Sequence, residues 1–525
     1  MGDKSTKRIQ LHKGDSLYYR LLIFGFMLIA YAAGIVCAAG GFNPDLDSYW
    51  LVGTGRWILE HGEMPHTNPW TYTEGLSVIV QQPLCAILNY VWYQYCGGFE
   101  SMWKLACMEN IILLSAVCYL AGKFSGSKED AVLTTGIVEV ILIASRYIVT
   151  RPYQLTMAAM AILIANLEVG RREGKYRRAT ISVFLVTLWQ ANYQMASLFM
   201  IPCFISCYFV GSVVEKVRDE KAKGKSLKDI GLLKDPKCYK WCPTYLAWFL
   251  AGLINPYGIH GLLYLPKSAK AMKLVGGMII EMVAPSTDSF SFLIVMVTLL
   301  MLVYRVIGKK NWTVPEALLV VGCALASFLA VRNVWMSILA FTVICPQTVR
   351  STKQEDEESA RKEGLLRICS IGVLILGILA IPFSVHSAGI FSETAGDSTG
   401  EMAAAIQSLP EDSRLYTSFN TGGVAMFAGH KIYIDARPEL YSPMITGGED
   451  ILQEWVDFEC EDTELLPLRV NDAEWEYYLV DSGEQLCYFL EYSGAGEVVC
   501  WSGDMKLFKY IPGKAVITNY GTKIF

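Results

Sequence analysis

Long apolar runs without charged residues constrain this chain more than any other feature. The first run, residues 21–40, carries no charge and matches the ~20 residues that a helix needs to cross the hydrocarbon of a bilayer. Several Lys and Arg residues precede it. A cleaved signal peptide is the alternative, but its apolar region is usually about 7–15 residues long. We therefore predict an uncleaved first membrane span.

Ten further apolar segments follow the first one. Of all residues, 53% are hydrophobic and 18% are charged, whereas soluble domains carry about 25% charged residues. Residues 21–385 therefore predict a polytopic α-helical membrane protein with about eleven spans. The count rises to thirteen if residues 78–96 and 267–283 also cross, but we expect these two stretches to be interfacial or re-entrant. The ten segments are 103–122, 131–149, 153–169, 178–193, 195–214, 242–262, 287–307, 315–331, 334–347 and 366–385.

The loops between these segments predict how the chain is oriented in a cell membrane. Residues 171–178, 216–240 and 305–310 are basic, and residues 350–367 are of mixed charge. Lys and Arg accumulate on the cytoplasmic side of membrane proteins. With eleven spans, all four loops can lie in the cytoplasm. Residues 1–20 would then be cytoplasmic and the C-terminus extracytoplasmic.

The C-terminal part of the chain has a different composition. Residues 389–525 contain 23 Asp and Glu against 8 Lys and Arg, a net charge of −15, while the whole chain carries −5. This part has no spanning run, so we predict an extracytoplasmic α/β domain over residues 386–525. Its charge argues against nucleic acid as a partner, because that binding needs basic surface. The expected strands are 414–418, 431–435, 476–481, 497–501 and 505–510, and the expected helices are 451–456 and 484–492.

The external loop over residues 41–82 contains the strongest local signal for chemistry. Asp45 and Asp47 lie just after the first span, two residues apart. The two carboxylates could hold one divalent cation, Mg²⁺ or Mn²⁺, or one of them could act as a base. The alternative is an ordinary solvated turn, because the Asn-Pro-Asp sequence ending at Asp45 favours a turn. His61 and His66 are further candidate bases, although a single loop histidine is more often structural.

The residues around Asp47 resemble a known family. Asp47-Ser48-Tyr49-Trp50 is followed by Gly55-Arg56-Trp57, by Glu60-His61-Gly62 and by Pro65. This pattern resembles the first external loop of the GT-C glycosyltransferases, which are membrane enzymes that use polyprenyl-phosphate-linked sugars. In that superfamily an acidic residue after the first span serves as catalytic base or metal ligand. The resemblance implies that role for Asp47 and, less directly, for Asp45.

The whole chain is similar to a bacterial group of GT-C-like membrane proteins. The similarity includes Arg151-Pro152-Tyr153-Gln154, Asn255-Pro256-Tyr257-Gly258, Arg332-Asn333 and the segment 434–441. The group carries a histidine where this chain has Gln194, so any chemistry of that histidine is missing here. Because the resemblance does not settle the group's own activity, the functional expectation rests on analogy.

Two arginines and one segment of the outer domain are candidate binding groups. Arg151 and Arg332 border apolar runs near the predicted outer face, and guanidinium suits phosphate because of its paired donors. Both could instead reach lipid headgroups or pair with a nearby acid, either Glu139 or Glu281. Asp435 and Arg437 end an expected strand, with Tyr441 one short turn further on. Ligands collect at such strand ends, although a local ion pair is the alternative.

These observations together predict a GT-C-type glycosyltransferase. It would move a sugar from a polyprenyl-phosphate-linked donor in the membrane to an extracytoplasmic acceptor. Its partners would be membrane lipid, this donor and the acceptor. The alternative is a non-enzymatic membrane protein, either a lipid or polysaccharide transporter or an envelope-assembly scaffold. A transporter would carry charged residues deep in several spans, and Glu139 is the clearest mid-span acid in the sequence.

Overall fold

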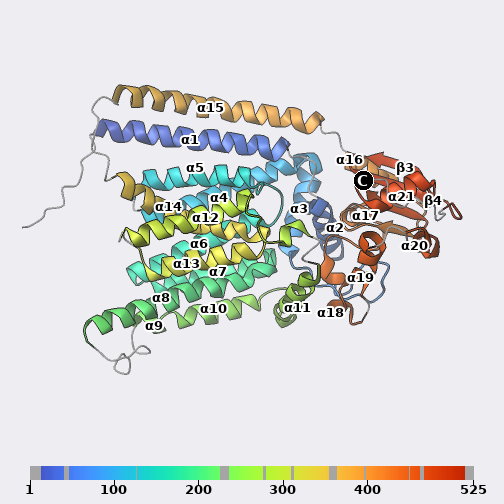
Figure 1. Ribbon diagram of the computed structural model, residues 1–525, viewed down its shortest axis with the longest axis horizontal. Coiled ribbons are helices and arrows are strands. Elements are labelled where there is room, and N and C mark those ends of the chain that lie inside the picture. Colours follow the sequence, from blue (N-terminus) through green and yellow to red (C-terminus); the bar gives the residue numbers. More distant parts are fainter. Residues whose placement is uncertain are drawn as a thin grey trace, which may run out of the picture.

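The protein consists of a bundle of long helices with a small α/β domain at one end. The computed structural model describes residues 13–40, 46–125, 127–224, 236–275, 279–308, 312–353, 363–394, 398–448, 450–461 and 466–514. The long helices run side by side, and the C-terminal domain covers one end of the bundle (Figure 1). The shorter helices α2 (Leu46–His61), α3 (Pro83–Cys96) and α11 (Ile259–Val275) lie between the bundle and this domain (Figure 1). The predicted fold class is confirmed.

Ten of the eleven predicted apolar segments each correspond to one helix of the bundle, and the segment 242–262 is the exception. By length and composition, six of the described helical segments could cross a membrane, and they include parts of the first and the last bundle helix. The bundle helices are α1 (Lys13–Gly40), α4 (Met102–Ser125), α5 (Lys128–Ala144), α6 (Tyr153–Glu173), α7 (Tyr176–Tyr193), α8 (Met200–Ala222), α10 (Cys242–Gly252), α12 (Phe290–Ile307), α13 (Val314–Leu329), α14 (Val334–Lys353) and α15 (Glu363–Thr394).

Shorter elements lie at the two ends of the bundle. Neither of the two ambiguous stretches, 78–96 and 267–283, is among the six candidate spans. The first of them forms α3 and the second lies partly in α11. The short elements are α2 (Leu46–His61), α3 (Pro83–Cys96), α9 (Pro236–Tyr239), α11 (Ile259–Val275), η1 (Phe99–Ser101), η2 (Met195–Phe199), η5 (Ile280–Met282) and η6 (Val331–Asn333).

The predicted single span over residues 242–262 is wrong, because two helices share it. Helix α10 ends at Gly252 and α11 begins at Ile259. Between them, the Asn255 side-chain amide donates to the carbonyl oxygens of Gly252 (2.8 Å) and Gly258 (3.0 Å). Pro256 follows directly and has no N–H to continue a helix. The turn therefore redirects the chain, and α11 packs against the outer domain.

Helices α1 and α15 lie side by side and run parallel along one side of the bundle (Figure 1). Glycines permit their close approach. A Cβ atom on Gly25 would lie 2.7 Å from the Leu374 Cα atom, and one on Gly377 would lie 2.7 Å from the Gly25 carbonyl oxygen. Small residues are a common device for packing membrane helices, because they let backbones touch. The opposite side of α15 exposes apolar side chains such as Ile375 and Leu379.

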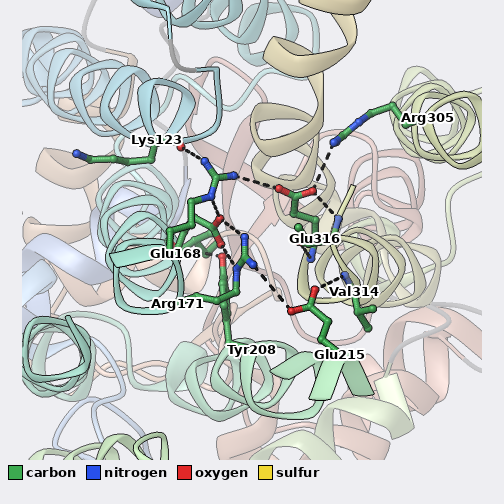
Figure 2. A network of polar contacts seen from close by, with 11 residues as sticks. Lys123, Glu168, Arg171, Tyr208, Glu215, Arg305, Val314 and Glu316 are labelled. Atoms are coloured by element: carbon green, nitrogen blue, oxygen red, sulfur yellow. Dashed lines mark hydrogen bonds and ion pairs between the residues drawn. The ribbon is translucent and has the colours of Figure 1, made fainter. Parts of the chain in front are cut away.

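Buried charges tie the bundle together at the end opposite the outer domain, and Figure 2 shows this network. The Glu168 side chain is 1% exposed and accepts hydrogen bonds from Arg171 at 2.6 and 3.0 Å. Arg172 pairs with both Glu168 and Glu316, the latter at 3.3 Å. Arg305 reaches the other Glu316 oxygen at 3.5 Å. We call these five residues the buried ion network.

The network joins α6 to the consecutive helices α12 and α13, which lie much later in the sequence. Glu316 also completes a capping box with Thr313 at the start of α13. The basic loop 171–178 and Arg305, in the last turn of α12, lie at this same end. The charge asymmetry that predicts orientation is therefore a feature of the folded structure.

Apart from the acids at the network end, Glu109 and Glu139 are buried within the described part of the bundle. Glu139 was identified from the sequence, whereas Glu109 was not. Glu139 accepts a hydrogen bond from the Asn110 side-chain amide at 2.7 Å. One residue earlier on α4, Glu109 accepts a hydrogen bond from the Tyr193 hydroxyl at 3.3 Å. Buried polar groups need such partners, because desolvation without a hydrogen bond costs several kcal/mol, about 2–7 by transfer measurements.

The C-terminal domain contains one four-stranded sheet. The strand order is β1-β2-β4-β3; β1 runs parallel to β2, and the other two pairs are antiparallel. The predicted segments 414–418, 476–481, 497–501 and 505–510 are confirmed as strands, and 451–456 and 484–492 as helices. The elements are α16 (Ser398–Gln407), β1 (Leu415–Thr417), α17 (Gly422–Ala428), η8 (Pro438–Tyr441), α18 (Pro443–Thr446), α19 (Ile451–Val456), η9 (Asp457–Glu461), α20 (Leu466–Asp472), β2 (Tyr477–Asp481), α21 (Gln485–Ser493), β3 (Gly496–Ser502) and β4 (Met505–Tyr510).

The predicted strand over residues 431–435 is wrong. Ile432 makes an isolated bridge to Thr71 of the external loop, and its N–H donates to the Trp70 carbonyl oxygen at 2.7 Å. On its other side the Thr417 side chain, rather than a backbone ladder, donates to the Ile434 carbonyl oxygen at 2.8 Å. The apolar alternation of this segment reflects burial between the external loop and the sheet.

The outer domain is packed firmly onto the bundle through α17 and α2. A Cβ atom on Gly422 would lie 2.1 Å from the Ile434 carbonyl oxygen, and one on Gly423 would lie 3.2 Å from the Leu46 carbonyl oxygen. The first turn of α17 therefore needs these glycines to fit. Tyr49 and Val52 of α2 belong to one buried apolar cluster with residues of β1, α16 and α17. Because this core is shared, the domain is held in place over the end of the bundle.

Candidate active site

A cavity of about 760 Å³ lies between the bundle and the outer domain. Its bundle side comes from the start of α2, the residues before α3, the loop before α6, and the η2, η5 and η6 turns. Helix α11 forms another part of its wall. The outer domain contributes residues 436–440, together with parts of α19, η9 and α21. Four of the predicted site residues line it: Asp47, Arg151, Arg332 and Arg437.

Asp47 lies in the first turn of α2 and faces this cavity. Its side chain is 28% exposed. One carboxylate oxygen accepts a hydrogen bond from the Trp50 indole N–H at 3.0 Å, and the other lies 3.3 Å from an Arg151 guanidinium nitrogen. The neighbouring Ser48 hydroxyl contacts the Thr150 hydroxyl at 3.1 Å. Helix α2 and the loop before α6 therefore hold the carboxylate together.

Arg151 bridges two carboxylates across the cavity wall. Besides Asp47, it contacts Glu281 of η5 at 2.5 Å. Of the two acids expected as possible partners of Arg151, Glu281 is the one that pairs with it. The other, Glu139, is hydrogen-bonded to Asn110. Because two acids already neutralise its charge, Arg151 is better suited to hold Asp47 in place than to bind a second anion.

Arg332 is different, because it is exposed to the cavity without a partner. Among the residues that the structure describes, it forms neither an ion pair nor a hydrogen bond through its side chain. Its backbone is fixed in η6, where the Val331 N–H donates to the Val283 carbonyl oxygen at 2.9 Å and the Asn333 amide donates to Ala326 at 3.1 Å. A fixed backbone with a free guanidinium is a suitable arrangement for an anionic ligand.

Asp435 and Arg437 form a buried pair, and only the arginine reaches the cavity. Asp435 accepts hydrogen bonds from the Arg437 backbone N–H at 2.9 Å and from its guanidinium at 3.1 Å. The guanidinium carbon lies 5.4 Å from the ring centre of Trp50 and 5.2 Å from that of Trp70. Burial acts to lower the pKa of Arg437, but the Asp435 charge outweighs this, so that the pKa is raised. Tyr441 is fully buried away from the cavity.

Three acids that the sequence did not indicate line the outer-domain side of the cavity: Glu439, Glu459 and Glu484. Glu439 accepts a hydrogen bond from the Gln81 side-chain amide at 2.9 Å, and burial raises its pKa. Burial raises the pKa of Glu459, and burial together with the Glu459 charge raises that of Glu484. With 23 acids in this part of the chain, no local pattern distinguishes these three.

Other residues with a predicted role lie elsewhere. His61 is exposed and stacked on Trp57, and His66 packs against Tyr257; neither lines the cavity. Gln194, which replaces the histidine of similar sequences, does line it. Asp45 lies outside the described residues.

The described residues do not form a metal site. No group of three or more His, Cys, Asp or Glu side chains within them could hold an ion. The Arg151 guanidinium already lies between Asp47 and Glu281, where a cation shared by these two carboxylates would lie. A metal-dependent mechanism would thus require Asp45, and we derive no step through a metal.

The fold and the cavity define a polytopic membrane protein with a polar site beneath an outer domain. No protein-family model matches the sequence, and no curated protein does. Among solved structures, the chain is similar to the oligosaccharyltransferase of Archaeoglobus fulgidus tethered with an acceptor peptide, with a TM-score of 0.53 and 10% identity over 90% of this chain and 70% of that one.

Two further solved structures hold lipid phosphates. The archaeal oligosaccharyltransferase AglB of the same organism, in complex with an inhibitory peptide and dolichol-phosphate, matches with a TM-score of 0.51 and 10% identity over 90% of this chain and 70% of that one. ArnT from Cupriavidus metallidurans bound to undecaprenyl phosphate matches with a TM-score of 0.50 and 11% identity over 94% of this chain and 98% of that one. The chain therefore has the GT-C fold that its external loop predicts, and at this identity the similarity shows the fold alone.

Proposed function

We propose that the protein is a GT-C-type glycosyltransferase that moves a sugar from a polyprenyl-phosphate-linked donor to an extracytoplasmic acceptor. The main support for the proposal is that Asp47 and Arg332 line the same cavity, which the outer domain covers. An acid for the acceptor and a cation for the departing phosphate are the two groups that such a reaction needs. Two proteins of the same fold hold a polyprenyl phosphate in their solved structures, which supports this class of donor.

In the proposed reaction, Asp47, Arg151 and Arg332 each have one role. The acceptor hydroxyl attacks the anomeric carbon of the sugar, and the bond from that carbon to the phosphate oxygen breaks. Asp47 takes the hydroxyl proton, and therefore it needs to lie within ~3 Å of that hydroxyl or one water away. Arg151 positions Asp47 as an ionised carboxylate. Arg332 stabilises the phosphate as its charge develops.

The buried Glu109 and Glu139 favour a second candidate, a membrane transporter. Intramembrane acids mark ion or substrate pathways in many transporters. In this chain each of the two accepts a hydrogen bond from a neighbouring helix, which also suits a structural role. The two proposals differ over Asp47, which a transporter does not require as a base.

Arg332 is expected to bind the donor phosphate through its guanidinium. Replacing it with Ala should weaken binding of undecaprenyl phosphate to the purified full chain by about 10- to 100-fold, because a charge-assisted hydrogen bond contributes about 1.5–3 kcal/mol. Arg332→Lys should weaken this binding less than Arg332→Ala, since it keeps the charge but not the paired donors. Arg146→Ala is the control, because Arg146 is an exposed arginine that does not line the cavity. If wild type and Arg332→Ala bind undecaprenyl phosphate with equal affinity, Arg332 does not bind the donor phosphate and contacts lipid headgroups instead.

We also propose that the outer domain is extracytoplasmic and that the buried ion network lies at the cytoplasmic end. The basic loops at that end support this orientation. Lys221 and Glu411 are exposed at opposite ends of the molecule. In intact cells, a membrane-impermeant maleimide should label Glu411→Cys above the wild-type background and Lys221→Cys only after permeabilisation. The reverse pattern would contradict the orientation.

A further inference from the structure

The outer-domain wall of the cavity contains two carboxyl groups without a cation. Glu459 belongs to η9, and Glu484 lies directly before α21. Glu459 accepts a hydrogen bond from the Tyr416 hydroxyl at 2.7 Å, and Glu484 accepts one from the Asp481 N–H at 3.0 Å. Neither is part of an ion pair within the described ranges. Both line the same cavity as Asp47.

The two carboxyl groups cannot both stay ionised at low cost unless something positive binds to them. Each is half-buried, and two neighbouring carboxylates repel each other. Desolvation raises the pKa of both groups, and the charge of Glu459 adds to this effect at Glu484. Arg437, the cation that the outer domain contributes to the cavity wall, is already paired with Asp435.

Aromatic side chains complete the wall beside these acids. Trp455 and Phe419 pack with their ring centres 5.5 Å apart, and both line the cavity. Trp455 is 8% exposed and interacts with Glu459 through its side chain. Aromatic faces attract cations. The wall therefore fits a ligand that carries an ammonium group.

The cavity as a whole is polarised. On the bundle side, Arg151 pairs with Asp47 and Glu281, and Arg332 is unpaired within the described residues. On the outer-domain side, Glu459 and Glu484 have no cation within the described residues. A neutral hydroxyl would leave the two carboxyl groups without a counter-charge, whereas an ammonium supplies both a charge and three donors.

We infer that Glu459 and Glu484, together with Trp455, form a subsite for a protonated primary amine. The inference rests on the proposed function only for why a substrate enters the cavity. The amine belongs either to the transferred sugar or to the acceptor. In both cases the two acids hold the reacting molecule by its amine while Asp47 acts at a hydroxyl group.

The test measures amine binding directly and needs no turnover. The purified full chain is titrated at constant ionic strength with glucosamine and with its neutral match, glucose, and with ethanolamine and its neutral match, ethylene glycol. At least one amine is expected to bind about 10-fold or more tightly than its neutral match. Tighter binding of glucosamine assigns the amine to a sugar, and tighter binding of ethanolamine assigns it to a non-sugar acceptor.

Matched variants locate the binding. Glu459→Gln and Glu484→Gln keep the side-chain shape and should each abolish the preference for the amine, whereas Glu497→Gln on the exposed face of β3 should not. Equal binding of amines and neutral matches by wild type, or an amine preference that survives in both Gln variants, would overturn the subsite. Amine binding without any glycosyl transfer would refute the proposed function and leave the subsite standing.

Discussion

Asp47→Asn is expected to lower glycosyl transfer by about 10²- to 10⁴-fold while the chain still folds and inserts, because this is the usual effect of losing a general base. The amide keeps the size of the side chain and can still accept the Trp50 hydrogen bond. It cannot take a proton from an acceptor hydroxyl at neutral pH. Arg151 keeps Glu281 as a partner, so that the cavity wall should stay intact.

The measurement is the transfer rate in membranes that contain equal amounts of each variant. Glu63→Gln is the control, since Glu63 is an exposed acid of the same external loop and does not line the cavity. Asp45→Asn should lower the transfer rate less than Asp47→Asn does, unless a metal joins the two carboxylates. Wild-type turnover by Asp47→Asn would refute the role of Asp47.

Glu168→Ala is expected to lower the free energy of unfolding by about 3–5 kcal/mol, as is typical when one partner of a buried ion pair is removed. The Glu168 carboxylate is 1% exposed and pairs with both Arg171 and Arg172. Without it, the two guanidinium groups are left close together with Glu316 as the remaining buried acid of the network. Both groups belong to α6, so their repulsion should destabilise the last turn of that helix, from which Arg172 reaches Glu316 of α13.

Thermal unfolding of the detergent-solubilised chain measures this effect, with Glu173→Ala as the matched control. Glu173 is one turn further along the chain and pairs with Lys175 on the surface. Such surface pairs contribute little to stability, so the control should unfold like wild type. If Glu168→Ala unfolded at the wild-type temperature, the buried ion network would not hold the bundle together.

The helices of the bundle could be predicted from the sequence because lipid solvation requires long, apolar and internally hydrogen-bonded segments. The two predicted elements that are wrong have local causes. The segment 242–262 is apolar throughout, and only the side-chain hydrogen bonds of Asn255 and the missing N–H of Pro256 break it. The segment 431–435 has the pattern of a strand, but the external loop and the Thr417 side chain take up its hydrogen bonds.

The candidate site was predictable to different degrees. Asp47 follows from its position after the first span, and Arg332 follows from a charge beside apolar runs. Asp435 and Tyr441 were expected at a strand end open to ligand, yet both are buried, and Arg437 alone of that group reaches the cavity. Glu459 and Glu484 are separated by a helix and a strand in the sequence, and the tertiary fold alone brings them together.

The central claim is that the chain consumes a polyprenyl-linked sugar, and lipid analysis of cells tests it most directly. Lipids are extracted from cells that lack the protein and from the same cells supplied with wild type, Asp47→Asn or Glu63→Gln. One polyprenyl-linked sugar should accumulate without the protein and with Asp47→Asn, and should return to its normal level with wild type and with Glu63→Gln. An identical pool of polyprenyl-linked sugars in all four strains would contradict the account.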